Sequence, residues 1–179
     1  GDLRFYCCQQ VYDKIMAISH MIIRPGEREQ FGKRMQFHIV KDRDTRSVLG
    51  NNVTFFDIGS KKAPQFGFQM DIAGKKLTFL GDEPCTQGTA EFVRGSDWLL
   101  AEAFCLYEER EIHKPYLYHH STVREPSELA QQNGVANLVL WHSEDATWPD
   151  RKSRYTNEAG QYYSGNVFVP DDLDVIDIG

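Results

Sequence analysis

Three side chains that can bind metals follow apolar runs or precede a predicted helix in this 179-residue sequence. Asp82 and His142 each come directly after an apolar run that predicts a strand, and His120 stands just before a predicted helix start. Ligand sites in α/β sheets gather beyond the carboxyl ends of strands, so we expect the three side chains to share one crevice. Carboxylate oxygen and imidazole nitrogen both bind zinc, which makes this crevice a candidate metal site.

Each of the three residues also has a plain structural explanation. Asp82 after Gly81 fits a turn, His142 fits a strand end with a hydrogen bond to Ser143, and His120 fits a helix entry. Taken singly, these structural roles are the favoured ones. The common position of the three residues at the ends of elements is what favours a functional site.

The elements that must position these residues alternate between strands and helices. Periodicity predicts helices over 9–21 and 124–132, and strands over 3–8, 35–40, 53–58, 66–72, 76–80, 98–104, 135–141, 166–169 and 173–178. The segment 42–52 is polar and predicts a turn. The short strands before residue 80 predict an antiparallel meander, and the later alternation predicts a layered α/β arrangement with helices packed on a sheet.

Composition indicates one globular domain spanning residues 1–179. The hydrophobic fraction is 41%, the charged fraction is 26% and the net charge is −6. These values argue against a disordered chain, which would be poorer in apolar residues. No stretch approaches the roughly 20 apolar residues that span a bilayer, so we expect no membrane partner. Four cysteines without a metal-finger or disulfide-framework spacing predict reduced thiols in a cytoplasmic protein.

The net negative charge gives no broad attraction to nucleic acid, but one local patch is basic. Arg151, Lys152 and Arg154 stand beside Tyr155. Two interpretations are open. Arg151 and Arg154 contact substrate phosphates, or the patch is a solvated helix start whose charge is neutralised by three acidic neighbours, which are Asp145, Asp150 and Glu158.

Four motifs occur in one order: Gly81-Asp82, then 99–104 with the sequence LLAEAF, then His120-Ser121-Thr122, then 138–142 with the sequence LVLWH. Over about residues 55–142 this pattern resembles the C-terminal half of a metallo-β-lactamase-fold hydrolase, in the ribonuclease Z and phosphodiesterase branch. The branch carries a "GD" strand end, an "LLxEA" strand, an "HST" helix start and a strand ending in "TH". The resemblance implies part of an α/β/β/α sandwich with mixed sheets.

The resemblance also implies roles for the matching residues. Asp82 bridges two zinc ions, His142 ligates one of them, and His120 acts as proton donor or phosphate contact with Glu102 orienting it. A metal pair lowers the pKa of a bound water, so that hydroxide attacks phosphorus. The implied substrate is a phosphodiester or another small ester, with RNA among the candidates.

The sequence departs from the family in its metal ligands. It contains no H-x-H, whereas the family hallmark is H-x-H-x-D-H, and Asp57 lies in a segment where the family carries a histidine. Asp57 serves either as an oxygen ligand or as a turn residue. The residue after Gly81-Asp82 is Glu83, where the family usually has Thr. Zinc needs three or four protein ligands, so we expect the isolated chain to be inactive and to bind zinc weakly.

Two explanations fit this shortage of ligands. The chain is the C-terminal portion of a hydrolase whose N-terminal half is missing, an expectation that a start at Gly1 favours. Alternatively, it is a catalytically inactive member that serves as a binding or structural module. In either case we expect it to form a homo-oligomer or to associate with the missing portion, because half a sandwich exposes a sheet face or edge.

Overall fold

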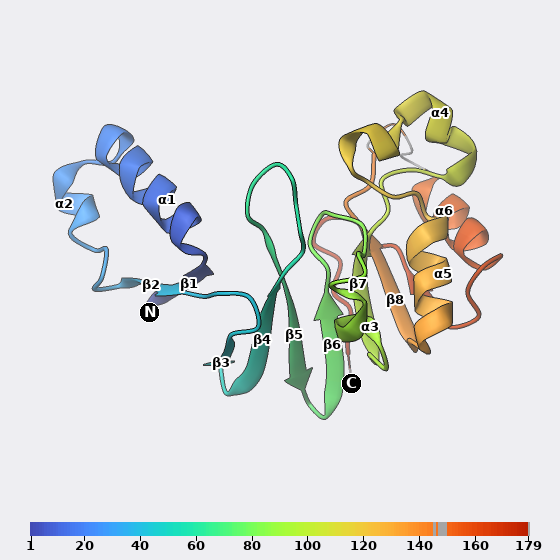
Figure 1. Cartoon of the computed structure of the whole chain (residues 1–179), viewed down its shortest axis with the longest axis horizontal. Helices are drawn as coiled ribbons and strands as arrows, with labels where there is room; N and C mark the ends of the chain where they lie inside the picture. Colours follow the sequence, from blue (N-terminus) through green and yellow to red (C-terminus); the bar gives the residue numbers. More distant parts are fainter. Residues whose placement is uncertain (145, 147–149, 179) are drawn as a thin grey trace.

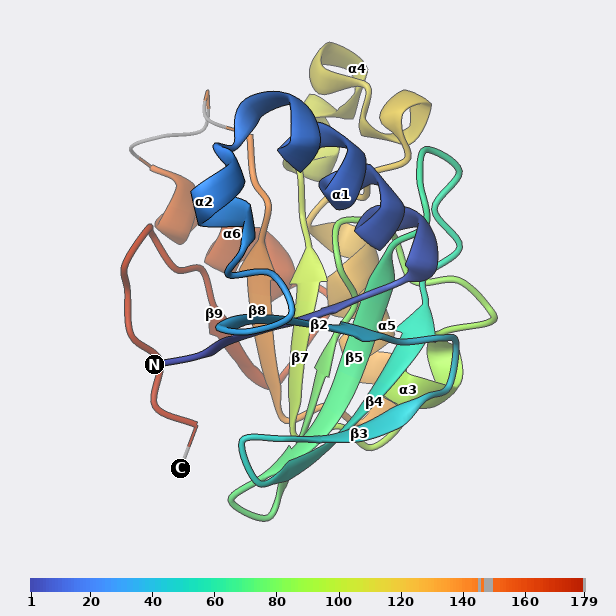
Figure 2. The same cartoon turned by 90° about the vertical axis from the view of Figure 1, so that its left-hand side faces the viewer.

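The computed structural model describes residues 1–144, 146 and 150–178, and in them two sheets lie between two groups of helices. The smaller sheet pairs β1 (Leu3–Cys7) with β2 (Met35–Ile39) in parallel, and α1 (Gln9–Ile22) and α2 (Pro25–Arg28) connect them. In Figure 1 these helices form one outer layer. Figure 2, turned by 90°, shows α1 and the two strands in front of the larger sheet.

The larger sheet contains seven strands within the described residues, arranged in chain order. They are β3 (Thr45–Val48), β4 (Asn51–Asp57), β5 (Phe66–Ile72), β6 (Lys75–Phe79), β7 (Trp98–Glu102), β8 (Asn137–Trp141) and β9 (Asn166–Phe168). Strands β3 to β6 pair antiparallel, and β6 to β9 pair parallel. The predicted meander and the predicted α/β half are therefore both confirmed, and they share one mixed sheet.

Helices cover the other face of the larger sheet. They are α3 (Ala90–Val93), α5 (Arg124–Asn133) and α6 (Arg151–Ala159). A further group, η1 (Tyr107–Glu109), α4 (Arg110–His113) and η2 (Pro115–Tyr118), lies at the end of the sheet where β6 to β8 finish. The order helix, sheet, sheet, helix confirms the predicted α/β/β/α sandwich with a mixed sheet.

The core lies between the larger sheet and its helices. Leu99 in β7 and Leu138 in β8 are completely buried, and Tyr155 of α6 packs in the same cluster. Continuous apolar runs are typical of parallel strands that are covered on both faces. Those two runs therefore predicted the most buried strands correctly.

Helix α1 follows its predicted periodicity but is not fully covered. Met21 and Ile22 are 83% and 75% exposed, and the only buried residue of α1 is Ser19. The helix ends at Ile22 because the next residues, ahead of Pro25, adopt extended backbone angles. Periodicity thus predicted the helix, but it did not predict which side chains of that helix would be buried.

Helix α5 matches its predicted ends. The Glu125 carboxylate accepts the N–H of Thr122 at 2.7 Å, which is one half of the predicted capping box. Gly134 ends the helix with a φ of 66°, in the left-handed region that favours glycine. The start of α5 fixes the segment that carries His120.

Two predictions of secondary structure are wrong. Strand β3 occupies part of the polar segment 42–52, because Leu49 and Gly50, with φ of 51° and 86°, form the two-residue turn of a β3–β4 hairpin. At the other end, 173–178 is not a strand, since Asp171 and Asp174 form ion pairs with Lys152 of α6 instead.

No helix among the described residues is long and apolar enough to cross a bilayer.

Gly67, the second residue of β5, offers a test of this packing. A Cβ there would lie 2.5 Å from Cε2 of Phe56 and 2.5 Å from the backbone oxygen of Phe79. We expect Gly67→Ala to lower the free energy of unfolding by about 1–3 kcal/mol through overpacking, measured by urea denaturation. Gly26→Ala is the matched control, because a Cβ at Gly26 meets nothing within 4 Å. Equal stability of both variants would contradict the close packing of β4 against β5.

Candidate active site

The ends of β6, β7 and β8 bring the predicted residues together. The three strands are parallel neighbours, so the segments that follow them leave the sheet side by side. Gly81 turns the chain after β6 with a φ of 74°, and a Cβ there would lie 2.8 Å from Cδ1 of Ile58. Only glycine combines this backbone angle with this close approach, and Asp82 follows it directly.

His142 leaves β8 in a left-handed conformation, with a φ of 56°. The backbone on both sides of it is held by the neighbouring segment, since Trp141 O accepts the N–H of Ala103 at 2.9 Å and Glu144 donates its N–H to Phe104 O at 2.7 Å. The ring of His142 lies 5.0 Å from the ring of His120, between centroids. The structure thus places the two predicted histidines in direct contact.

Phe104 is a residue of this site that sequence reasoning missed. Its ring stacks on His120 at 5.1 Å and lies 6.4 Å from the ring of His142. It follows the LLAEA strand immediately, in the same strand-end position as Asp82 and His142. That position is the signal that could have found it, but an apolar side chain gave no chemical reason to look there.

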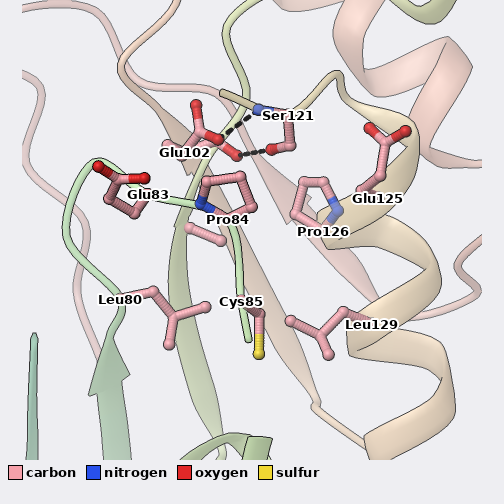
Figure 3. A pocket seen from close by; sticks show the side chains of 10 residues that line it. Leu80, Glu83, Pro84, Cys85, Glu102, Ser121, Glu125, Pro126 and Leu129 are labelled. Carbon is pink, nitrogen blue, oxygen red and sulfur yellow. Dashed lines mark hydrogen bonds between the residues drawn. The ribbon is translucent and has the colours of Figure 1, made fainter. Parts of the chain in front are cut away.

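Glu102 lies behind His120, as the resemblance implies. Its Oε2 is 3.3 Å from Nδ1 of His120, and its Oε1 accepts the backbone N–H of Ser121 at 2.5 Å. The Glu102 backbone oxygen accepts the Ser121 hydroxyl at 3.0 Å, so two hydrogen bonds join these residues, as Figure 3 shows. The His120 contact is long for a hydrogen bond, and in the described part of the chain Oε2 and Nδ1 have no hydrogen-bond partner.

Burial dominates the electrostatics of this pair. Glu102 is 1% exposed, and burial raises its pKa to about 8 against the opposing effect of the Ser121 hydrogen bonds. The negative charges of Asp82 and Glu83 add to this increase. Glu102 therefore carries a proton through most of the neutral range.

The pKa of His120 is shifted in the opposite direction, to a lower value. Burial lowers the pKa of its imidazole, and the neighbouring His142 and Lys62 lower it further, while Asp82 and Glu83 partly compensate. A lowered pKa favours the neutral imidazole at pH 7, which carries one N–H. At neutral pH the shifts in pKa therefore favour the uncharged form of both Glu102 and His120.

Asp82 and His142 line one side of a cavity of about 410 Å³ between the smaller sheet and the ends of β6 and β8. Zinc needs three or four protein ligands. Across residues 1–144, 146 and 150–178, no three His, Cys, Asp or Glu side chains converge to hold a metal ion. The residues present therefore do not fit a complete metal centre.

No protein-family model matches the chain. Ribonuclease Z of Bradyrhizobium sp. (strain ORS 278) is 32% identical over 132 residues, which are 73% of this chain and 42% of that protein. The structure of human tRNase Z, short form, superposes with a TM-score of 0.66 at 18% identity over 99% of this chain and 68% of that one. Zn²⁺-bound PqqB from Methylobacterium extorquens gives a TM-score of 0.72 at 15% identity, over 97% and 63% of the two chains.

The chain has the metallo-β-lactamase fold, in its ribonuclease Z-like branch. It spans less than half the length of the ribonuclease Z that it matches. The sequence motifs thus identified the branch correctly. In the structure, the same motifs lie at the ends of the strands that form the site. PqqB was solved with bound zinc, but at 15% identity its similarity to this chain concerns the fold alone.

Asp57 takes a turn role in this metallo-β-lactamase fold. Its Oδ1 accepts the backbone N–H of Gly59 at 2.8 Å, and its own N–H donates to Oδ1 of Asp42 at 2.9 Å. The residue is exposed, and it is not among the described residues that line the cavity of Asp82 and His142. The structure does not bring it to the other candidate ligands.

The basic patch at the start of α6 is held in ion pairs. Arg151 contacts Oδ1 of Asp171 at 2.6 Å and donates to the Ser143 hydroxyl at 2.8 Å, while Arg154 contacts Glu109 at 2.6 Å. Lys152 pairs with Asp171 and Asp174. Asp145, one of the acidic neighbours named above, lies outside the described residues. These contacts position the segment after His142, and neither Arg151 nor Arg154 is among the described residues that line the cavity.

Glu102 generates a prediction about pH. Because its pKa is raised to about 8, the folded chain binds more protons than the unfolded chain above the ordinary pKa near 4.5, so stability is greatest below that value. We expect the free energy of unfolding to fall as the pH rises from 5 to 8, by on the order of 2–4 kcal/mol, and Glu102→Gln to flatten this slope.

Urea denaturation at each pH measures the slope. Glu128→Gln, which removes a half-buried carboxylate from α5, controls for the loss of one charge. A slope that is the same with and without Glu102 would refute the assignment of this titration.

The ion pairs at α6 generate a second prediction. Arg151→Ala removes a side chain that is 12% exposed and joins Ser143 to Asp171, so we expect a loss of about 1–2 kcal/mol in the free energy of unfolding. Lys152→Ala, which removes an exposed partner of the same Asp171, should have the smaller effect in the same denaturation series. The reverse order would show that Arg151 does not anchor this segment.

Proposed function

We propose that this chain supplies the C-terminal part of a metal-dependent hydrolase that cleaves phosphodiester bonds. The contact of His120 with both Glu102 and His142, at the strand ends where Asp82 also lies, carries the proposal. The 32% identity to a ribonuclease Z supports RNA as a candidate substrate, beside other phosphodiesters and small esters. Zinc is the metal that best suits a carboxylate with imidazoles.

Asp82 and His142 would hold metal together with ligands that the described residues do not provide. When bound, the metal ions supply Lewis acidity and a hydroxide at neutral pH. Within this chain, Phe104 stacks on the ring of His120 and fixes its plane. Glu102 faces Nδ1, so Nε2 is the ring nitrogen left to act on substrate. In the imidazolium form of His120, Nε2–H can deliver its proton to the leaving oxygen, and the ring then returns to the neutral imidazole that its lowered pKa favours.

The expected domain organisation forms part of the proposal. Residues 1–179 act as the C-terminal portion of the fold and associate with a segment carrying the H-x-H-x-D-H ligands, or with another copy of the chain. The exposed side chains of Met21 and Ile22 on α1 support such an association, since exposed apolar groups favour contact with another surface. The chain's partial coverage of its relatives also supports it.

A second function is a non-catalytic binding or structural module on the same scaffold. One observation favours it: the turn role of Asp57, in the segment where the resembled family carries a ligand histidine. The two functions differ in a measurable way. A hydrolase gains metal and activity when the missing ligands are supplied, whereas a module does not.

The test compares the 179-residue chain with a polypeptide that adds the H-x-H-x-D-H segment. For the chain alone we expect less than one zinc ion after desalting, and no hydrolysis of bis(4-nitrophenyl) phosphate. The extended protein should cleave it, and His120→Ala should lower kcat by about 100-fold or more through the loss of proton transfer. Ser143→Ala, outside the proton pathway, is the control for local disturbance.

Two results would overturn this proposal. Tight binding of two zinc ions by the isolated chain would show that its own ligands suffice. Absence of hydrolysis by the extended protein, with or without bound zinc, would favour the binding module.

A further inference from the structure

The cavity beside Asp82 and His142 has aromatic walls that the proposed reaction does not use. It is lined by Tyr6 of β1, Phe66 of β5, Phe79 of β6 and Trp141 of β8. These four rings come from both sheets, and each is only half-buried. A large ring that is left half-exposed around a concave space offers apolar area that a ligand can cover.

The rings of Phe79, Trp141 and His142 form a connected surface. Trp141 lies 5.1 Å from Phe79 and 5.6 Å from His142, between ring centroids. The apolar wall therefore continues without a break to the histidine of the proposed reacting centre. A group that rests on Trp141 would have its attached ester at His142 and Asp82.

The charge of the lining decides what kind of group fits. Among the described residues that line the cavity, none is Lys or Arg, and the one carboxylate is that of Asp82. Cys7, Cys8 and Val11 add apolar or weakly polar surface from the smaller sheet and α1. Such walls disfavour a phosphate inside the cavity and favour an uncharged group.

The volume is sufficient for such a group. At about 410 Å³ the cavity falls within the range of roughly 300–1,000 Å³ that is typical of small-molecule sites. Aromatic side chains bind flat rings by stacking with little dependence on ring identity.

We propose that this cavity binds a planar, uncharged aromatic ring of the substrate and that Trp141 is the residue that determines this specificity. The inference deepens the proposed function and rests on it for the ester that the ring carries. The ring can come from two sources, a nucleobase or an aryl ester. Both present the same flat apolar face to the cavity.

Isothermal titration calorimetry tests the proposal with three probes, on the 179-residue chain and on the extended protein in which the H-x-H-x-D-H segment joins Asp82 and His142. Adenosine supplies a nucleobase, 1-naphthol supplies an aryl ring, and ribose 5-phosphate supplies charge without a ring. We expect at least one ring compound to bind at least tenfold more tightly than ribose 5-phosphate. Tighter binding of adenosine assigns the nucleobase source, and tighter binding of 1-naphthol assigns the aryl source.

Trp141→Thr should weaken binding of the ring compound about tenfold. The control is Trp98→Phe, because Trp98 is 6% exposed, packs on Phe168 and is outside the cavity lining. Circular dichroism checks that each variant is folded. If Trp141→Thr does not fold, Phe66→Leu provides the same test at another aromatic residue of the lining, with the same expected weakening.

The proposal is overturned if neither ring compound binds, if ribose 5-phosphate binds as tightly as they do, or if a folded wall variant binds as tightly as the parent chain. Its failure is distinguishable from failure of the proposed function. Phosphodiester cleavage by the extended protein without ring binding overturns the cavity assignment alone. Ring binding without cleavage supports the cavity assignment and overturns the hydrolase.

Discussion

The parallel pairing of β6, β7 and β8 is the constraint on which the rest of this structure depends. It requires strands that are buried on both faces, and the sequence meets that requirement with the leucines at 99, 138 and 140. Because parallel strands finish at one edge, the residues after them meet there whatever their separation along the chain. The shared position of Asp82 and His142 at one cavity follows from this pairing, and His120 reaches His142 from the segment before α5.

Much of the fold could be predicted from the sequence because strong local signals coincided with the final packing. The apolar runs of β7 and β8, the cap and the glycine stop of α5, and the spacing of α1 each had a local cause that the tertiary structure preserves. Strand β3 escaped prediction because its pairing with β4 depends on the backbone angles of Leu49 and Gly50 rather than on alternating side chains. Ion pairs displaced the expected last strand, since charged residues alone do not reveal which partner they will meet.

The residues of the site also fall into those that could be predicted from the sequence and those that could not. Titratable side chains at strand ends could be named from their types and order, and the structure brings Asp82, His120, Glu102 and His142 into one region. Phe104 and the aromatic cavity could not, because their roles arise from surfaces that residues distant in the sequence form together. The partners of Arg151 also required the structure, which uses that side chain to join the segment after His142 to the C-terminal residues.

The left-handed backbone at position 142 limits what this site can become. Residues with branched or bulky side chains are strained at a φ of 56°, whereas Gly, Asn, Asp and His accept this region more readily. Three of these four carry a nitrogen or oxygen that binds metals or water. The backbone angle at this position therefore restricts the tolerated substitutions largely to side chains that can act as ligands. A histidine at position 142 therefore meets two demands at once, since it accepts the backbone angle at the end of β8 and carries a nitrogen that can bind a metal.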